Sequence, residues 1–374
     1  MKKNMITIKG KLDLAAGTKR LDFLQIFRGL AALLVLFHHI DDILRVNHGY
    51  LLLGGIFEPG WSGVDFFFVL SGFIIYYIHY KDIENPYVLK PYLQKRFVRI
   101  YPMTWIVTIP ILPMFFIFPG LGDPGVQTNI WVIVKQMFLF PQERVILNVT
   151  WTLSHEVLFY LIFSLLIITR KVFAVPVIGA WILLTVLNVI GLFKFSIWEL
   201  DFLFSPFHIE FLLGCFAAYI YLKIKINKPD VILISGVLLF GLAWIMRYQG
   251  IVPKYTIYSI LLFGSASFLI VLGSVYKEIK KTKLTKCFLF IGDASFSIYL
   301  THFPALSLLN IIFTKLGMFN SLNYFYTSSI MIIISIIIGC IAYILIEKPL
   351  LAFSRRKISG WYPKPEVNDK QITI

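Results

Sequence analysis

Cysteine is scarce in this sequence of 374 residues, which contains only Cys215, Cys287 and Cys340. All three fall inside or beside apolar stretches. Their spacing provides neither a disulfide framework nor a set of metal ligands, so we interpret them as small buried hydrophobic residues and expect no metal site. The sequence also contains no internal repeat, no low-complexity tract and no stretch typical of a second, water-soluble domain.

Charge is scarce as well. Charged residues make up 15% of the chain against 58% hydrophobic residues, and the mean hydropathy is +0.78. This composition excludes an ordinary soluble protein of this length. The sequence instead predicts an all-α fold, a polytopic transmembrane helical bundle, because about ten apolar stretches are long enough to cross a bilayer. These stretches are 21–40, 62–80, 99–118, 150–169, 172–190, 204–222, 231–247, 256–276, 287–309 and 325–346.

Acidic residues are the rarer charged type, which leaves a net charge of +15. If the N-terminus is cytoplasmic and ten spans alternate, 27 basic residues lie on the inner side and 7 on the outer side. This asymmetry follows the positive-inside rule and requires no nucleic acid partner. An eleventh crossing at 129–140 would reverse it for the second half, and that stretch is short and contains Lys135. We therefore predict a re-entrant or interfacial segment there.

Three regions follow from this topology, in which both termini are cytoplasmic. Residues 1–20 form a basic N-terminus, 21–350 the membrane domain, and 351–374 a C-terminal tail. The first span follows Lys19 and Arg20 and lacks a small-residue cleavage pattern, so we expect it to be a retained span and not a signal peptide.

The first span contains ionisable residues, which mark a functional site because a charge inside a bilayer is costly. Arg28 and His39 are eleven residues apart. On an α-helix this spacing places them within about 20° of one face and about 16 Å apart along the axis. Arg28 could instead be a snorkelling anchor, and one histidine could sit at the outer interface beside Asp41 and Asp42. The shared face favours His39 over His38 as the functional histidine.

The other polar residues inside the spans form two predicted layers. The inner layer is cationic and contains Arg28, Arg96 and Arg99, although the last two could simply be cytoplasmic surface charges. The outer layer contains acids, hydroxyls and imidazoles: His39, Asp65, Ser154, Glu156 and His302. Three further candidates are Trp151, Ser295 and Tyr299. Ser295, Tyr299 and His302 share one helical face, yet serine and tyrosine often only join helices.

Seven segments, taken in order, resemble acyltransferase family 3, the integral-membrane O-acyltransferases of bacterial surface glycans. They are FRGLAALLVLFHH, GVDFFFVLSGF, RFVRIYP, WTLSHEVLFYL, FLLGC, GDASFSIYLTHFP and IEKP, and they cover about 21–350. The resemblance implies a multi-pass protein of the bacterial cytoplasmic (inner) membrane. It implies transfer of an acyl group, usually acetyl, from acyl-CoA to a hydroxyl group of a cell-surface polysaccharide, lipopolysaccharide or glycolipid. It also implies that acetyl-CoA is a co-substrate and that no cofactor is permanently bound.

The resemblance also assigns roles to single residues. It implies essential roles for Arg28 and His39 in the first motif, for Arg96 and Arg99 in the third, and for Ser154 and Glu156 in the fourth. His38 and His155 are not positions that the pattern requires. The hydrolase-like domain fused to some members is absent from this sequence, so we expect a stand-alone form.

The residues suggest a mechanism that agrees with this resemblance. Anionic coenzyme A is expected on Arg28, Arg96 and Arg99, because arginine binds phosphate with a fork of donors. His39 would act as general base or as the nucleophile that accepts the acyl group. Glu156 or Asp65 would orient the imidazole.

Several alternatives remain open at this stage. Ser154, Tyr299 or backbone amides would stabilise the oxyanion, and Ser295, His302 and Trp151 are candidates for oxyanion or acceptor contacts. Ser154 and Glu156, two apart, point in nearly opposite directions on a regular helix, so both cannot face His39 there. A transporter or flippase of lipid-linked sugars is the alternative function, because charges inside spans also mark substrate paths.

Overall fold

The computed structural model describes residues 21–117, 125–193, 195, 197–280 and 282–359. Within these ranges every regular element is a helix. Ten helices are long and apolar enough to cross a membrane, which confirms the all-α bundle and identifies a multi-pass membrane protein. The corresponding helices are α2 (Asp22–His48), α3 (Gly63–His79), α4 (Leu89–Ile117), α6 (Trp151–Ile168), α7 (Lys171–Val189), α9 (Phe207–Lys223), α10 (Pro229–Tyr248), α11 (Ile257–Ser274), α13 (Ser295–Lys315) and α14 (Met318–Ala342).

Shorter helices connect or extend these spans. They are α5 (Ile130–Met137), α8 (Trp198–Leu203), α12 (Lys283–Asp293) and α15 (Lys348–Ser359), together with 3-10 turns at Leu52–Gly55, Glu58–Ser62, Pro86–Val88 and Asn148–Thr150. The eight residues of α5 extend over only about 12 Å. The stretch 129–140 is therefore too short to be an eleventh span, in agreement with its interpretation as a re-entrant or interfacial segment.

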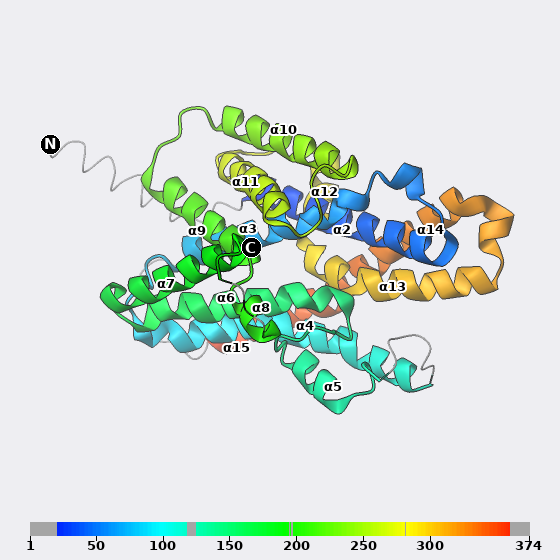
Figure 1. The fold of residues 1–374 in the computed structure, drawn as a ribbon, viewed down its shortest axis with the longest axis horizontal. Coiled ribbons are helices and arrows are strands. Elements are labelled where there is room, and N and C mark those ends of the chain that lie inside the picture. Colours follow the sequence, from blue (N-terminus) through cyan, green and yellow to red (C-terminus); the bar gives the residue numbers. More distant parts are fainter. Residues whose placement is uncertain (1–20, 118–124, 194, 196, 281, 360–374) are drawn as a thin grey trace.

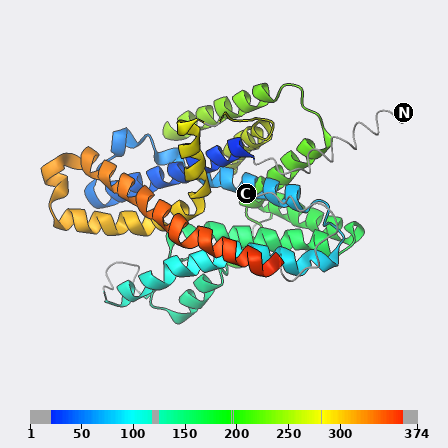
Figure 2. The same cartoon turned by 180° about the vertical axis from the view of Figure 1, so that it is seen from behind.

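The ninth span begins later than the sequence predicts. The hydropathy pattern places it at 287–309, whereas the helix that crosses starts at Ser295, and α12 is a separate helix that ends at Asp293. Figure 2 shows α12, in yellow, running across the direction of α13. The cause is packing against α2. A side chain at Gly292 would overlap the backbone of Gln25, and one at Gly29 would press on the backbone of Gly292.

The helix after the tenth span continues past residue 350. A π turn at Tyr343–Glu347 joins α14 to α15, and Figure 2 shows the three as one long rod, coloured orange to red. The predicted boundary between membrane domain and tail thus falls inside α15. The predicted N-terminal region 1–20 and the tail beyond 359 lie outside the described residues.

α2 and α3 run through the middle of the bundle, with α10 and α11 along one side and α4 and α6 along the other (Figure 1). The contact between α3 and α9 is made backbone to backbone. A side chain at Gly72 would overlap the Phe211 carbonyl, and one at Gly214 would overlap the Val69 carbonyl. Glycine is therefore required at both positions for the helices to approach this closely.

Candidate functional site

α2 carries both of its predicted functional residues on the face that meets α12 and α13. The Nε atom of Arg28 donates to Ser295 Oγ at 2.8 Å, and its Nη2 donates to the Gly292 carbonyl at 2.6 Å. Further along, the ring centroids of His39 and His302 are 5.2 Å apart. The Arg28 side chain is 6% exposed. A buried guanidinium with these partners is not a snorkelling anchor, and the shared face of Arg28 and His39 is confirmed.

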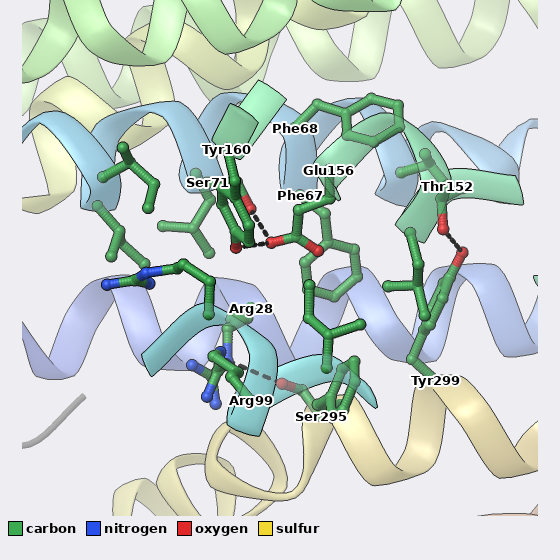
Figure 3. Close-up of a pocket in the computed structure, with 18 residues that line it drawn as sticks. Arg28, Phe67, Phe68, Ser71, Arg99, Thr152, Glu156, Tyr160, Ser295 and Tyr299 are labelled. Atoms are coloured by element: carbon green, nitrogen blue, oxygen red, sulfur yellow. Dashed lines mark hydrogen bonds between the residues drawn. The ribbon is translucent and has the colours of Figure 1, made fainter. Parts of the chain in front are cut away.

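A cavity of about 790 Å³, part of it open to the outside, lies beside this face. It brings together six predicted site residues from four helices: Arg28, Arg96, Arg99, Glu156, Ser295 and Tyr299. Figure 3 shows Arg28 and Arg99 at one end of it, Tyr299 and Thr152 at the other, and Glu156 between them. The rest of the lining is largely apolar and includes Val64, Phe67, Leu70, Ile74 and Phe296.

The arginine end offers hydrogen-bond donors that the described protein does not use. Arg96 Nη2 lies 3.2 Å from His79 Nε2, and its guanidinium lies over the Tyr160 ring at 5.6 Å. Arg99 lies over Phe296 at 5.9 Å. Within the described ranges, the buried Nε of Arg96 and the buried Nη1 of Arg28 have no hydrogen-bond partner. Unused buried donors on cationic groups favour an anionic ligand at this end of the cavity.

Glu156 is held by two residues that the sequence analysis did not single out. Its Oε1 accepts a hydrogen bond from Ser71 Oγ at 2.9 Å and another from the hydroxyl of Tyr160. Tyr160 follows Glu156 by four residues on α6, so the helical spacing was a signal for this pair. No contact of Glu156 with His39 is present among the described residues. The arrangement fixes a carboxylate in the cavity wall beside the arginines.

The opposite end of the cavity is closed by a hydroxyl pair. Tyr299 OH and Thr152 Oγ1 are 2.7 Å apart, and both lie near the Val149 carbonyl, at 3.2 Å and 2.9 Å. The Tyr299 ring also packs on the His302 ring, with 5.8 Å between centroids. His39 does not line the cavity, and Tyr299 and His302 connect the cavity to it.

Besides His39 and His302, three other predicted site residues lie outside the cavity lining. Ser154 Oγ is directed at the Thr150 carbonyl of its own helix, at 3.5 Å, as its spacing from Glu156 requires. Trp151 packs against aromatic rings, among them Phe207 at 5.3 Å. Asp65 is fully buried and its carboxyl group faces that of Glu210 on α9.

Acidic residues that the sequence analysis left aside surround Arg28. Asp293 and Glu347 supply the negative charge near its guanidinium. The Asp293 carboxylate accepts from Gln25 Nε2 at 2.7 Å, and Glu347, which belongs to the IEKP segment, accepts from Ser297 Oγ at 2.5 Å. The motif was visible in the sequence, but nothing local indicated that the π turn would direct Glu347 toward Arg28.

His38 and His39 have different surroundings. The Lys254 ammonium donates to His38 Nε2 at 3.0 Å, and Asp42 Oδ2 lies 3.3 Å from the same nitrogen. Burial lowers the pKa of Lys254, which lies in the loop between α10 and α11. Because His38 already uses this nitrogen, His39 is the better candidate for chemistry. Ligand atoms of His38, His39 and Asp42 fall within 4.8 Å of one another, a spacing that suits a metal ion, but the ammonium competes for the same lone pair.

Comparisons with known proteins bear on the family to which the chain belongs. A family model described as an acyltransferase domain matches residues 21–344. The chain is similar to the exopolysaccharide production protein ExoZ of Rhizobium meliloti, with 26% identity over 318 residues, 81% of this chain and 93% of that protein. It is also similar to the O-acetyltransferase OatA of Staphylococcus aureus, with 25% identity over 329 residues, 78% of this chain and 52% of that protein. The match therefore spans about half of OatA. No solved structure matches the chain.

Proposed function

Because the chain belongs to acyltransferase family 3, we propose that it is a membrane O-acyltransferase that uses acyl-CoA to acylate a hydroxyl group of a surface polysaccharide or glycolipid. The names of two relatives support the acceptor class, since one is an exopolysaccharide production protein and the other an O-acetyltransferase. The second name also favours acetyl as the acyl group.

The observation that carries the proposal is the convergence of Arg28, Arg96 and Arg99 on one end of the cavity. Coenzyme A is highly anionic, and guanidinium groups bind phosphate through paired donors. The unused Nε of Arg96 and Nη1 of Arg28 supply such donors. The apolar part of the lining suits the slender pantetheine arm, which would leave the thioester near Tyr299.

The proposed chemistry takes place beyond Tyr299, where His39 is the base or the nucleophile. As a base, His39 removes the proton of the acceptor hydroxyl while its oxygen attacks the thioester carbon. The C–S bond then breaks, and the proton ends on the coenzyme A sulfur. The Thr152 and Tyr299 hydroxyls, 2.7 Å apart, both lie at hydrogen-bond distance from the Val149 carbonyl, and one of them would have to turn to the thioester oxygen to stabilise the oxyanion.

The proposed topology separates donor and acceptor. Coenzyme A is made in the cytoplasm, and the inner layer of basic residues lies on that side if the N-terminus is cytoplasmic. The acceptor would be modified on the outer face, because His39 lies in the second half of α2, about 16 Å along the helix from Arg28.

A thiol-release assay tests this function. Purified protein in detergent receives acetyl-CoA with or without alkali-deacylated exopolysaccharide fragments, and free coenzyme A is measured with a thiol reagent. We expect thiol release that depends on the acceptor, with alkali-labile acetyl groups appearing on the glycan. If no thiol appears, and proteoliposomes instead speed the crossing of lipid-linked sugars, the transporter alternative replaces the proposal.

A further inference from the structure

His39 lies apart from both carboxylates that the sequence analysis offered to orient it. Glu156 accepts from Ser71 and Tyr160 in the cavity wall, and Asp65 faces Glu210. A histidine that removes a proton with one ring nitrogen needs a partner for the other nitrogen, because that partner fixes the tautomer and the ring orientation. Another group must therefore supply this contact.

His302 on α13 has the required geometry. It is fully buried, and its Nδ1 lies 3.1 Å from the Ile298 carbonyl oxygen. A carbonyl oxygen only accepts hydrogen bonds, so Nδ1 carries the proton in the neutral ring and Nε2 is an acceptor. Nε2 is buried and has no partner in the described part of the chain.

His39 is placed to use this acceptor. The two ring centroids are 5.2 Å apart. The ring planes are inclined by 36°, and no hydrogen bond joins the two rings in the described structure. Rotation of the His39 ring edge toward Nε2 would bring a nitrogen into the usual hydrogen-bond range of about 2.7–3.2 Å.

We infer that His302 is the positioning residue for His39 and accepts a hydrogen bond from its second nitrogen through Nε2. The inference rests on the proposed acyl transfer. When His39 takes the proton of the acceptor hydroxyl at one nitrogen, the N–H at its other nitrogen stays on His39 and donates to His302 Nε2. This bond becomes charge-assisted in the imidazolium and so stabilises it. The proton taken from the acceptor later passes from His39 to the departing thiolate, and His302 ends unchanged.

Asp42 is the carboxylate that competes for this role. Its oxygen lies within 4.8 Å of a His39 nitrogen, but the Asp42 carboxylate already accepts a hydrogen bond from Arg45 Nη2 at 2.9 Å. Asp42 follows His39 by three residues on the same helix. Asp42 on α2 and His302 on α13 can therefore be compared directly by substituting each in turn.

The test compares two substitutions of His302 by steady-state kinetics with acetyl-CoA and the glycan acceptor. His302→Phe keeps an aromatic ring and removes the acceptor, so kcat should fall about 10–100-fold, the scale of losses on removing an orienting partner. The KM for acetyl-CoA should stay close to that of the native protein. His302→Gln places an amide oxygen near the position of Nε2 and should recover part of the lost kcat.

Two control variants separate positioning from packing. His208 on α9 is also buried, its Nε2 meets the Phe202 carbonyl at 3.1 Å, and its ring packs against Trp181 and His155. His208→Phe therefore reports the effect of exchanging a buried histidine for phenylalanine, and it should leave kcat nearly unchanged. Asp42→Asn should also retain most of kcat.

Four outcomes would overturn the inference: native kcat in folded His302→Phe, an equal loss in His208→Phe, no recovery in His302→Gln, or a larger loss in Asp42→Asn. If His302→Phe does not accumulate in the membrane, His302→Met removes the same acceptor and replaces it in the comparison. Failure of the proposed function looks different, because the native protein itself would then transfer no acyl group.

Discussion

Removal of either arginine at the cavity end should weaken donor binding by an amount that the structure predicts. Arg96 and Arg99 both line the cavity, and each would donate hydrogen bonds to a coenzyme A phosphate. Hydrogen bonds to charged groups contribute about 1.5–3 kcal/mol. Arg96→Ala and Arg99→Ala should each raise the Kd for acetyl-CoA by roughly 10–150-fold.

The lysine variants sharpen this prediction. Arg99→Lys keeps the charge but loses the planar fork of donors, so it should recover only part of the affinity. Arg96→Lys should recover less, because Arg96 is also stacked over Tyr160 and lies 3.2 Å from His79. Isothermal titration calorimetry with the purified protein in detergent at fixed salt measures each Kd.

Arg170→Ala provides the matched control. Arg170 is exposed at the start of α7 and does not line the cavity. Removal of Arg170 changes the net charge by the same amount as removal of Arg96 or Arg99. The Arg170→Ala variant should bind acetyl-CoA with the Kd of the native protein. If Arg170→Ala weakens binding as much as the cavity variants do, the attraction comes from overall charge. If both cavity variants bind normally, these arginines are surface charges and the donor site is misplaced.

Three other predictions test the packing, the cavity wall and the topology. Gly72→Ala and Gly214→Ala should each destabilise the protein by about 1–3 kcal/mol through overpacking, measured as a lower Tm in detergent. Gly241→Ala, which has open space around it, should keep the native Tm. Equal Tm values for all three variants would show that α3 and α9 do not touch as described. The double variant Tyr160→Phe with Ser71→Ala removes both hydrogen-bond donors of Glu156 and should lower kcat more than either single change. A double variant with native kcat would exclude Glu156 from the mechanism. In a background without Cys215, Cys287 and Cys340, an impermeant maleimide applied to whole cells should label Thr128→Cys and Asn148→Cys but not Lys171→Cys; labelling at 171 would contradict the predicted topology.

The sequence predicted the spans well because their length and hydropathy are set by the bilayer. It also predicted that Arg28 and His39 share a face, since this depends only on the period of one helix. The break between α12 and α13 was missed because it arises from packing of Gly292 on α2 and not from a local breaker. Long-range contacts decide such features.

The candidate site was predictable in part. Helical spacing correctly separated Ser154 from Glu156, and only Glu156 lines the cavity. The position of Asp65 could not be predicted, because its neighbour Glu210 lies on a helix far along the chain. The unpartnered Nε2 of His302 likewise depends on the Ile298 carbonyl and on the approach of α2 to α13.

The central claim is that His39 performs the acyl transfer on a donor held by the arginines. His39→Gln should accumulate in the membrane and bind acetyl-CoA with near-native Kd, because His39 does not line the cavity. The same variant should lose acceptor-dependent thiol release by about 10²–10⁴-fold, the contribution of a general base. Thiol release close to the native rate in a folded His39→Gln variant would contradict the account.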